Sequence, residues 1–200
     1  MHTAQADAPP SALPRKIQIV PLVGLPFAAA LLGLTVYAIG SDSLWLLFLC
    51  HVAGGGLWTA IDLFVGLALG PIIGTLSMPG RAEFTAKFMP KMVIIMPTVV
   101  TMTLATGLQI AMRLGNLNPG TSPKDWLVVS MIVVGVMAII ALGILEPANI
   151  TVLWQMRKEQ PNPAVIERMM KRFVYTAGIT GVMQIATLII MTKMRSFHAA

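Results

Sequence analysis

Apolar residues occur in five long blocks along this chain, separated by short polar segments. Each block holds about twenty residues or more, which lets a helix cross a hydrocarbon core of about 30 Å at about 1.5 Å per residue. The pattern predicts an all-α fold, a polytopic bundle of about five transmembrane helices. The expected spans are residues 17–40, 44–76, 92–112, 126–156 and 173–191.

The two ends of the chain differ from the blocks between them. Residues 1–16 are polar, small and rich in proline, so their composition predicts an N-terminal tail outside the packed fold. Residues 17–195 form the expected bundle, and residues 196–200 a C-terminal tail. The first apolar block exceeds the roughly 7 to 15 residues of a signal-peptide core, so we expect it to remain as a helix.

Two of the expected spans, residues 44–76 and 126–156, are longer than one crossing requires. Each contains a proline near its end, Pro71 and Pro147. Because proline lacks the backbone N–H and its ring clashes with the preceding turn, we expect these residues to kink the helices or end their buried parts. The similar placement of the two prolines also suggests a duplicated two-helix unit, with chance similarity between apolar helices as the alternative.

Composition supports a membrane protein and excludes several other classes. The sequence is 56% hydrophobic and only 11% charged, against roughly 25% charged in soluble domains. The net charge of +6 comes from basic residues placed singly at helix ends, which argues against a nucleic-acid partner. The single cysteine, Cys50, excludes an internal disulfide. We find no phosphate-binding glycine loop, nucleophile elbow or HExxH motif.

The distribution of Lys and Arg orients the bundle through the positive-inside rule. An N-in/C-out topology places ten of the fourteen basic residues on the cytoplasmic side. We therefore predict a multi-pass protein of a cell membrane, most simply a bacterial inner membrane. Its expected partners are membrane lipid and other membrane subunits or further copies of the chain. The cytoplasmic basic residues are Arg15, Lys16, Arg81, Lys87, Lys91, Arg157, Lys158, Arg168, Lys171 and Arg172.

Only three ionisable residues fall deep within the spans: His51, Asp62 and Glu146. Such groups cost roughly 2.5 to 3.5 kcal/mol on insertion scales and by default mark function. At 100° per residue, His51, Gly55, Trp58 and Asp62 lie on nearly one face of a helix. The sequence therefore predicts a polar stripe that points into the bundle.

Asp62 and Glu146 are expected at comparable depth in parallel helices, where they could face each other. Two carboxylates in one low-dielectric site cannot both ionise cheaply, so a proton or a cation would be held there. Alternatively, each carboxylate pairs with a lysine such as Lys87 or Lys91, or Glu146 caps an interrupted helix near Pro147.

His51 is the candidate ligand for a metal or haem. The adjacent run of glycines, residues 54–56, would permit either close helix packing or the approach of a flat cofactor. Histidine commonly ligates haem iron and methionine can supply the opposite axial position, for which Met96 and Met183 are candidates. The alternative is that His51 forms a hydrogen bond across a helix interface.

Short motifs in the second and third spans carry a family resemblance. They are His51-x6-Trp58, Lys87-Phe88-Met89-Pro90, Met96-Pro97-Thr98 and Thr106-Gly107-Leu108. Together they resemble the CopD/HemJ-like family of small polytopic, haem-associated membrane proteins over about residues 44–112. The resemblance implies haem b at His51, with Gly55, Trp58 and Met96 around it.

The same family also has a lysine and a histidine in the helix that follows a tryptophan. Here residues 127–130, after Trp126, read Leu-Val-Val-Ser, and Ala141 stands where the later histidine would fall. The resemblance therefore implies a haem-associated relative without the set needed for protoporphyrinogen oxidation. Three functions stay open at this point. The first is an electron-transfer or accessory subunit of a larger membrane complex, which, if it is an enzyme, would make the protein a membrane oxidoreductase component. The second is a small ion or metal permease that uses Asp62 and Glu146, and the third is a purely structural membrane subunit.

Overall fold

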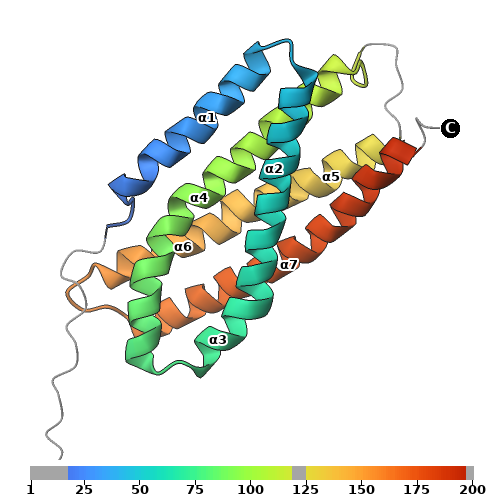
Figure 1. Ribbon diagram of the computed structural model, residues 1–200. Helices are drawn as coiled ribbons and strands as arrows, with labels where there is room; N and C mark the ends of the chain where they lie inside the picture. Colours follow the sequence, from blue (N-terminus) through green and yellow to red (C-terminus); the bar gives the residue numbers. More distant parts are fainter. Residues whose placement is uncertain (1–17, 119–124, 197–200) are drawn as a thin grey trace, which may run out of the picture.

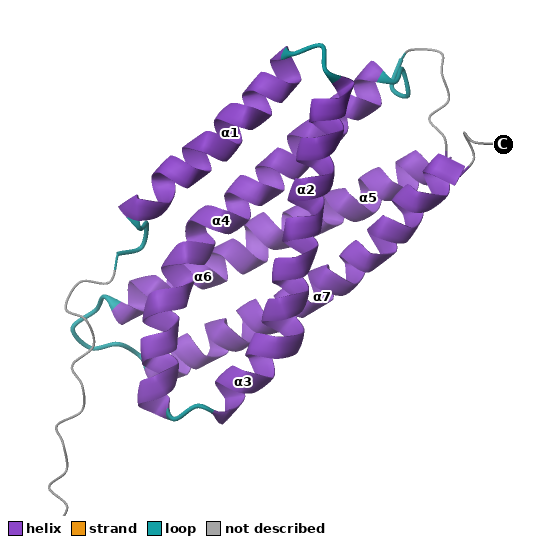
Figure 2. Cartoon of the chain, viewed as in Figure 1, coloured by secondary structure: helices purple, strands orange, loops and turns teal. Residues whose placement is uncertain are grey.

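The computed structural model describes residues 18–118 and 125–196, with side chains up to Thr192. Within these residues every regular element is helical (Figure 2). The predicted all-α fold is therefore confirmed. The predicted N-terminal tail, residues 1–16, lies outside the described residues, and so do residues 197–200 of the predicted C-terminal tail.

The described elements form five long helices in chain order. A short 3-10 turn, Leu22–Gly24, precedes α1, Leu25–Gly40. The second helix joins α2 (Leu44–Leu63), the π-helical segment η2 (Phe64–Leu69) and α3 (Gly70–Thr75). The third is α4 (Met78–Arg113). The fourth joins α5 (Asp125–Ile140), the π-helical segment η3 (Ala141–Leu145) and α6 (Glu146–Met156). The fifth is α7 (Pro163–Ser196).

The five helices lie side by side, and their connections alternate between the two ends of the bundle (Figure 1). The α1–α2 turn and the end of α4 lie at one end. The α3–α4 and α6–α7 connections lie at the other, which is called the loop end below. Within the described residues, five helices are long and apolar enough to cross a membrane. This arrangement agrees with five crossings, and the N-in/C-out orientation stays a prediction.

Several helices begin at places that the apolar blocks did not indicate. The first helix begins near residue 22 rather than 17 because Pro21 disfavours helical backbone in the residue before it. In α4 the helix starts fourteen residues before position 92, where Ser77 Oγ accepts a hydrogen bond from Gly80 N at 3.4 Å. Asn162 Oδ1 similarly accepts from Ala164 N at 3.1 Å before α7.

Pro71 and Pro147 do not end their helices. Each follows a π-helical segment by two residues, and the hydrogen bonds Gly70 N to Val65 O and Glu146 N to Ala141 O span five residues. A π-helical turn widens the helix, which relieves the clash between a proline ring and the preceding turn. The prediction that these prolines end the helices is therefore wrong, whereas the alternative, that they kink the helices, stays a prediction. The shared arrangement agrees with a duplicated two-helix unit.

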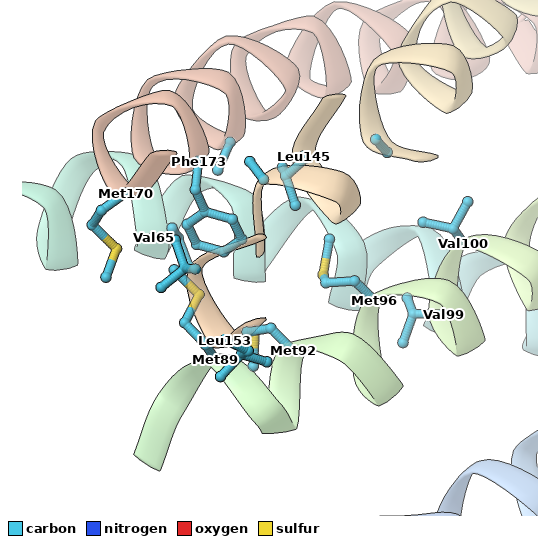
Figure 3. Close-up of a cluster of buried hydrophobic side chains, with 14 of the residues drawn as sticks. Val65, Met89, Met92, Met96, Val99, Val100, Leu145, Leu153, Met170 and Phe173 are labelled. Carbon is cyan, nitrogen blue, oxygen red and sulfur yellow. The ribbon is translucent and has the colours of Figure 1, made fainter. Parts of the chain in front are cut away.

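The main hydrophobic core lies between α4, α5, η3, α6 and α7, and Trp58 of α2 and Val65 of η2 close it. Methionine is frequent there: Met89, Met92 and Met96 project from α4 (Figure 3). A smaller cluster joins α1, α2 and α4. It consists of Ala38, Leu47, Cys50, Met102 and Ile110.

Candidate functional site

Asp62 is the most deeply buried carboxylate among the described residues, with 1% of its surface exposed. Its Oδ2 atom accepts two hydrogen bonds from α7, one from Thr180 Oγ1 at 2.8 Å and one from Gln184 Nε2 at 3.0 Å. Thr180 and Gln184 are four residues apart and so lie on one face of α7. The carboxyl group is thereby held between α2 and α7 by neutral donors.

Glycines bring the backbones of these two helices close enough for the contacts. A Cβ atom on Gly66 would lie 2.4 Å from Gly178 Cα, and one on Gly181 would lie 2.9 Å from Leu63 Cδ2. Small residues at helix crossings allow such close approach in membrane proteins. The crossing therefore sits directly beside Asp62 and fixes its distance to Thr180.

The lysines expected as partners of the buried carboxylates are placed elsewhere. Lys87 Nζ lies 2.6 Å from Glu83 Oε1, one helical turn away on the exposed side of α4. Lys91 is exposed to the surroundings of the bundle. In the part of the chain with described side chains, neither lysine forms an ion pair with Asp62 or Glu146, which removes that interpretation.

Glu146 and Asn149 form a second polar group, on α6. Asn149 is completely buried, and neither its Oδ1 nor its Nδ2 atom has a hydrogen-bond partner among the described residues. The Oε1 atom of Glu146 is likewise buried without a partner there. Since they lie three residues apart, the two side chains share a helix face. Buried polar atoms without partners are costly and rare, which marks this face as a candidate site.

The two carboxylates do not pair directly in the described structure. Asp62 is bound to α7, whereas Glu146 belongs to α6, which packs mainly against α4, α7 and η3. The helix α7 contacts both α2 and α6, which carry the two groups. That Asp62 and Glu146 face each other stays a prediction.

His51 lies on the same face of α2 but nearer the opposite end, against α4. Its Nδ1 atom is 2.9 Å from the carbonyl oxygen of Thr103. A Cβ atom on Gly107 would lie 2.6 Å from His51 Cε1, so the glycine leaves room for the imidazole edge. Gly54 likewise meets Thr103, whose Oγ1 would lie 2.6 Å from an added Cβ. These contacts are those of a hydrogen bond across a tightly packed helix interface.

The predicted polar stripe thus divides between two neighbours. His51 and Gly55 face α4, where Gly55 would place a Cβ 3.6 Å from Thr103 Cγ2. Trp58 is buried in the main core, and Asp62 faces α7. All four residues lie at contacts with neighbouring helices, but they do not line one space.

A haem held between His51 and Met96 does not fit this arrangement. Met96 precedes Thr103, the residue that His51 contacts, by seven positions, which is about 10 Å along α4. Met96 is 4% exposed and packs in the main core with Trp58. The glycines that were to admit a macrocycle, Gly54 and Gly55, contact Thr103 instead. His51 itself keeps one feature of a ligand, because a hydrogen bond donated by Nδ1 to a carbonyl leaves Nε2 with a free electron pair.

Sequence reasoning missed Thr180, Gln184 and Asn149. The available signal was the small number of strongly hydrogen-bonding side chains inside apolar spans, since such residues commonly join helices in membranes. These three side chains carry no charge, so the insertion cost that singles out ionisable residues does not single them out.

The fold and its five apolar helices define an integral membrane protein of the all-α, multi-pass class. No family model, curated protein or solved structure matches the chain. Function must therefore be argued from the buried polar groups themselves.

Proposed function

We propose that the protein is a small permease that binds a proton or small cation at Asp62 and moves it across the membrane. The observation that carries the proposal is a carboxyl group with 1% of its surface exposed and hydrogen bonds only from neutral side chains. An isolated carboxylate charge is expensive in this environment, so a proton or a bound cation neutralises it.

The hydroxyl group of Thr180 supports reversible binding. Besides Asp62, it lies 3.0 Å from the carbonyl oxygens of both Thr176 and Ala177. A hydroxyl has one hydrogen to donate. It can donate to Asp62 when the carboxylate is ionised and turn to a backbone carbonyl when Asp62 carries a proton. The hydroxyl of Thr180 therefore has a hydrogen-bond acceptor whether Asp62 is ionised or protonated.

The polar face of α6 offers a second binding position. Glu146 and Asn149 present buried oxygen and nitrogen atoms without partners in the described structure. A proton on Glu146, a water molecule or a cation would satisfy them. Because α7 contacts both α2 and α6, a shift of this helix would affect both positions together.

Two measurements test the proposal directly. For a bound proton, infrared spectra of the protein in lipid should contain the carbonyl band of a protonated carboxylic acid, and Asp62→Asn should remove the Asp62 component of that band. In proteoliposomes with an internal pH dye, an imposed membrane potential should drive proton flux that Asp62→Asn abolishes. For a bound cation, the band of Asp62 should be absent and an imposed Na⁺ gradient should drive Na⁺ flux that the same variant abolishes.

Glu83→Gln is the matched control, because Glu83 is an exposed carboxylate paired with Lys87 at 2.6 Å. It should keep both the infrared band and the flux. Flux that is equal in the parent and in Asp62→Asn would contradict the proposal. Absence of flux in every variant, with normal assembly, would favour the purely structural subunit.

Haem binding by His51, in an electron-transfer or accessory subunit, is a second candidate. It is supported by the hydrogen bond between His51 Nδ1 and Thr103 O, which orients the imidazole and leaves Nε2 available as a ligand. The second axial ligand would then be a water or a residue of another subunit, since Met96 lies in a different part of the core.

A further inference from the structure

A cavity of about 560 Å³ opens at the loop end of the bundle, between η2 and α3, the start of α4, and the first half of α7. Its size falls within the roughly 300 to 1,000 Å³ typical of sites for small ligands. It is separate from the Asp62 hydrogen bonds, although Gly66 borders both regions. The cavity is therefore a candidate ligand site distinct from Asp62.

The walls of the cavity are mostly apolar. Gly66, Gly70 and Gly74 are spaced four residues apart along η2 and α3, while Met170 and Val174 line it from α7. Gly66 and Gly70 pack tightly against Gly178 and Val174 of α7, whereas a Cβ atom on Gly74 would meet no described atom within 4 Å, so the open part of this wall lies at Gly74. Such a surface accommodates hydrocarbon and gives water few hydrogen-bonding partners.

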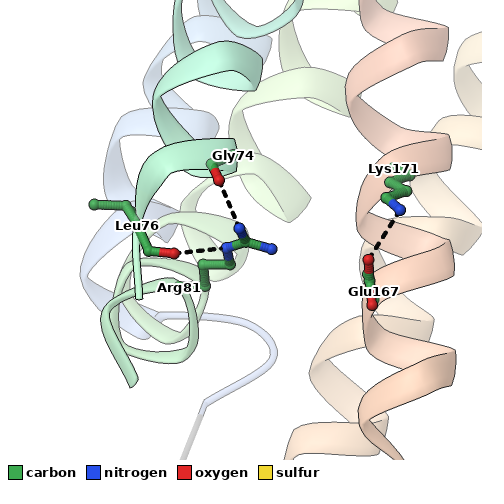
Figure 4. Close-up of polar contacts among 5 residues, drawn as sticks. All are labelled: Gly74, Leu76, Arg81, Glu167 and Lys171. Atoms are coloured by element: carbon green, nitrogen blue, oxygen red, sulfur yellow. Dashed lines mark hydrogen bonds and ion pairs between the residues drawn. The ribbon is translucent and has the colours of Figure 1, made fainter. Parts of the chain in front are cut away.

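One fixed positive charge lies at the cavity wall. Arg81 Nε donates to Leu76 O at 2.9 Å, and its Nη2 donates to Gly74 O at 2.6 Å (Figure 4). These bonds satisfy carbonyl groups at the end of α3 and hold the guanidinium in place. Since a guanidinium has five N–H donors, it retains donors for a further acceptor.

Arg81 forms no direct ion pair with an acid among the described side chains, and the cavity lining carries two basic residues and one acid. Glu167 is the acidic residue of the cavity lining, and its Oε1 lies 2.9 Å from Lys171 Nζ. Among the side chains that the structure describes, Arg81 has no carboxylate within ion-pair distance. The cavity thus combines an apolar interior with one net positive charge, which is complementary to an amphiphile with an anionic head.

We propose that this cavity binds an anionic phospholipid, with the phosphate on Arg81 and an acyl chain along the apolar lining beside Gly74. Arginine is well suited to the phosphate because its planar group donates two parallel hydrogen bonds. The loop end of a transmembrane bundle lies at the level of lipid head groups, so both parts of the lipid are available there.

Native mass spectrometry of the detergent-solubilised full chain can test this. The protein is titrated with phosphatidylglycerol and with phosphatidylcholine of the same acyl chains. The parent should bind phosphatidylglycerol about tenfold more tightly, and Arg81→Gln should remove the preference, as expected for loss of a charged hydrogen bond. Arg113→Gln is the control: Arg113 also donates to a backbone carbonyl, Ile39 O at 2.7 Å, but does not line the cavity.

A second variant keeps the proposal testable if Arg81→Gln does not fold. A Cβ atom on Gly74 would have no described neighbour within 4 Å, so Gly74→Leu can extend into open space and reduce the cavity. It should weaken binding of both lipids while Arg81 remains. Gly143→Leu, equally uncrowded and outside the cavity lining, should bind as the parent does.

Three results would overturn the proposal: phosphatidylglycerol preference retained in Arg81→Gln, parental binding in Gly74→Leu, or displacement of the lipid by inorganic phosphate alone. The last would indicate a site for free phosphate rather than lipid. None of these results bears on proton flux through Asp62, so the two proposals fail independently.

Discussion

Thr180 Oγ1 lies 2.8 Å from Asp62 Oδ2, and this hydrogen bond joins residues separated by 118 positions in the chain. It connects the second crossing to the fifth and lies beside the closest backbone approach between them, at Gly66 and Gly178. The Asp62–Thr180 hydrogen bond and the Gly66–Gly178 contact therefore lie side by side between the same two helices. Substituting one residue of each contact in turn measures how much each contributes to holding the helices together.

Removal of the Thr180 hydroxyl should have a modest cost. Thr180→Val is expected to lower the free energy of unfolding by about 0.6 kcal/mol and by no more than roughly 1.7 kcal/mol, the range for hydrogen bonds between membrane helices. The measurement is reversible unfolding in mixed detergent. Thr192→Val is the control, because Thr192 is exposed and donates to Leu188 O of its own helix. Equal effects would show that the Asp62 contact adds nothing to stability.

The glycine contact should be much less tolerant of substitution. Gly66→Ala would place a methyl group 2.4 Å from the Gly178 backbone, and overpacking of this kind costs about 1 to 3 kcal/mol. Gly56→Ala, with no described atom within 4 Å of the new Cβ, should instead be neutral or stabilise the helix by up to about 1 kcal/mol. A stable Gly66→Ala variant would mean that α2 and α7 are not so close.

The family resemblance predicts a haem spectrum that depends on His51. The purified protein should show a Soret band, and His51→Ala should abolish it, while His2→Ala and His198→Ala should leave it unchanged. Because Met96 is remote from Thr103 in the structure, Met96→Leu should also leave the band in place. A fully assembled preparation with no Soret absorbance and no pyridine haemochrome would remove the haem candidate.

The N-in/C-out orientation can be tested with single cysteines in a background in which Cys50 is replaced by alanine. Asp42→Cys lies in the exposed turn before α2 and Gln160→Cys in the exposed connection before α7. Neither replaces the capping side chains of Ser43 or Asn162. A membrane-impermeant thiol reagent should label position 42 from outside intact cells and position 160 only after the membrane is opened. The reverse pattern would contradict the orientation.

The fold class was accessible from sequence because apolar block length alone identifies membrane helices. The boundaries were less accessible. Residues 78–91 are too polar to extend an apolar block, yet they continue α4 because Ser77 begins the helix and Glu83 pairs with Lys87. From the sequence, Pro71 predicted a kink or an end of the second helix. In the structure the helix continues through Pro71, preceded by the π-helical segment Phe64–Leu69, which contacts α7.

The candidate site was predictable only in part. Insertion cost identified Asp62, but its partners come from a helix more than a hundred residues away, and no local pattern shows which face of α7 meets α2. The same holds for His51, where the adjacent glycines suited either a cofactor or a neighbouring helix. In the structure, Gly107 of α4 lies against one edge of the His51 imidazole, so a neighbouring helix rather than a cofactor occupies that edge.

The two π-helical segments also bear on how the chain can change in length. Each accommodates one residue more than the same stretch of α-helix, and one residue turns an α-helix by about 100°. If one residue were deleted from Phe64–Leu69, together with replacement of Pro71 by alanine, the segment could become α-helical while α2 and α3 kept their present neighbours. A deletion within α4 would instead rotate every later side chain away from its contact. Insertions and deletions in this bundle should therefore be tolerated best at these two segments.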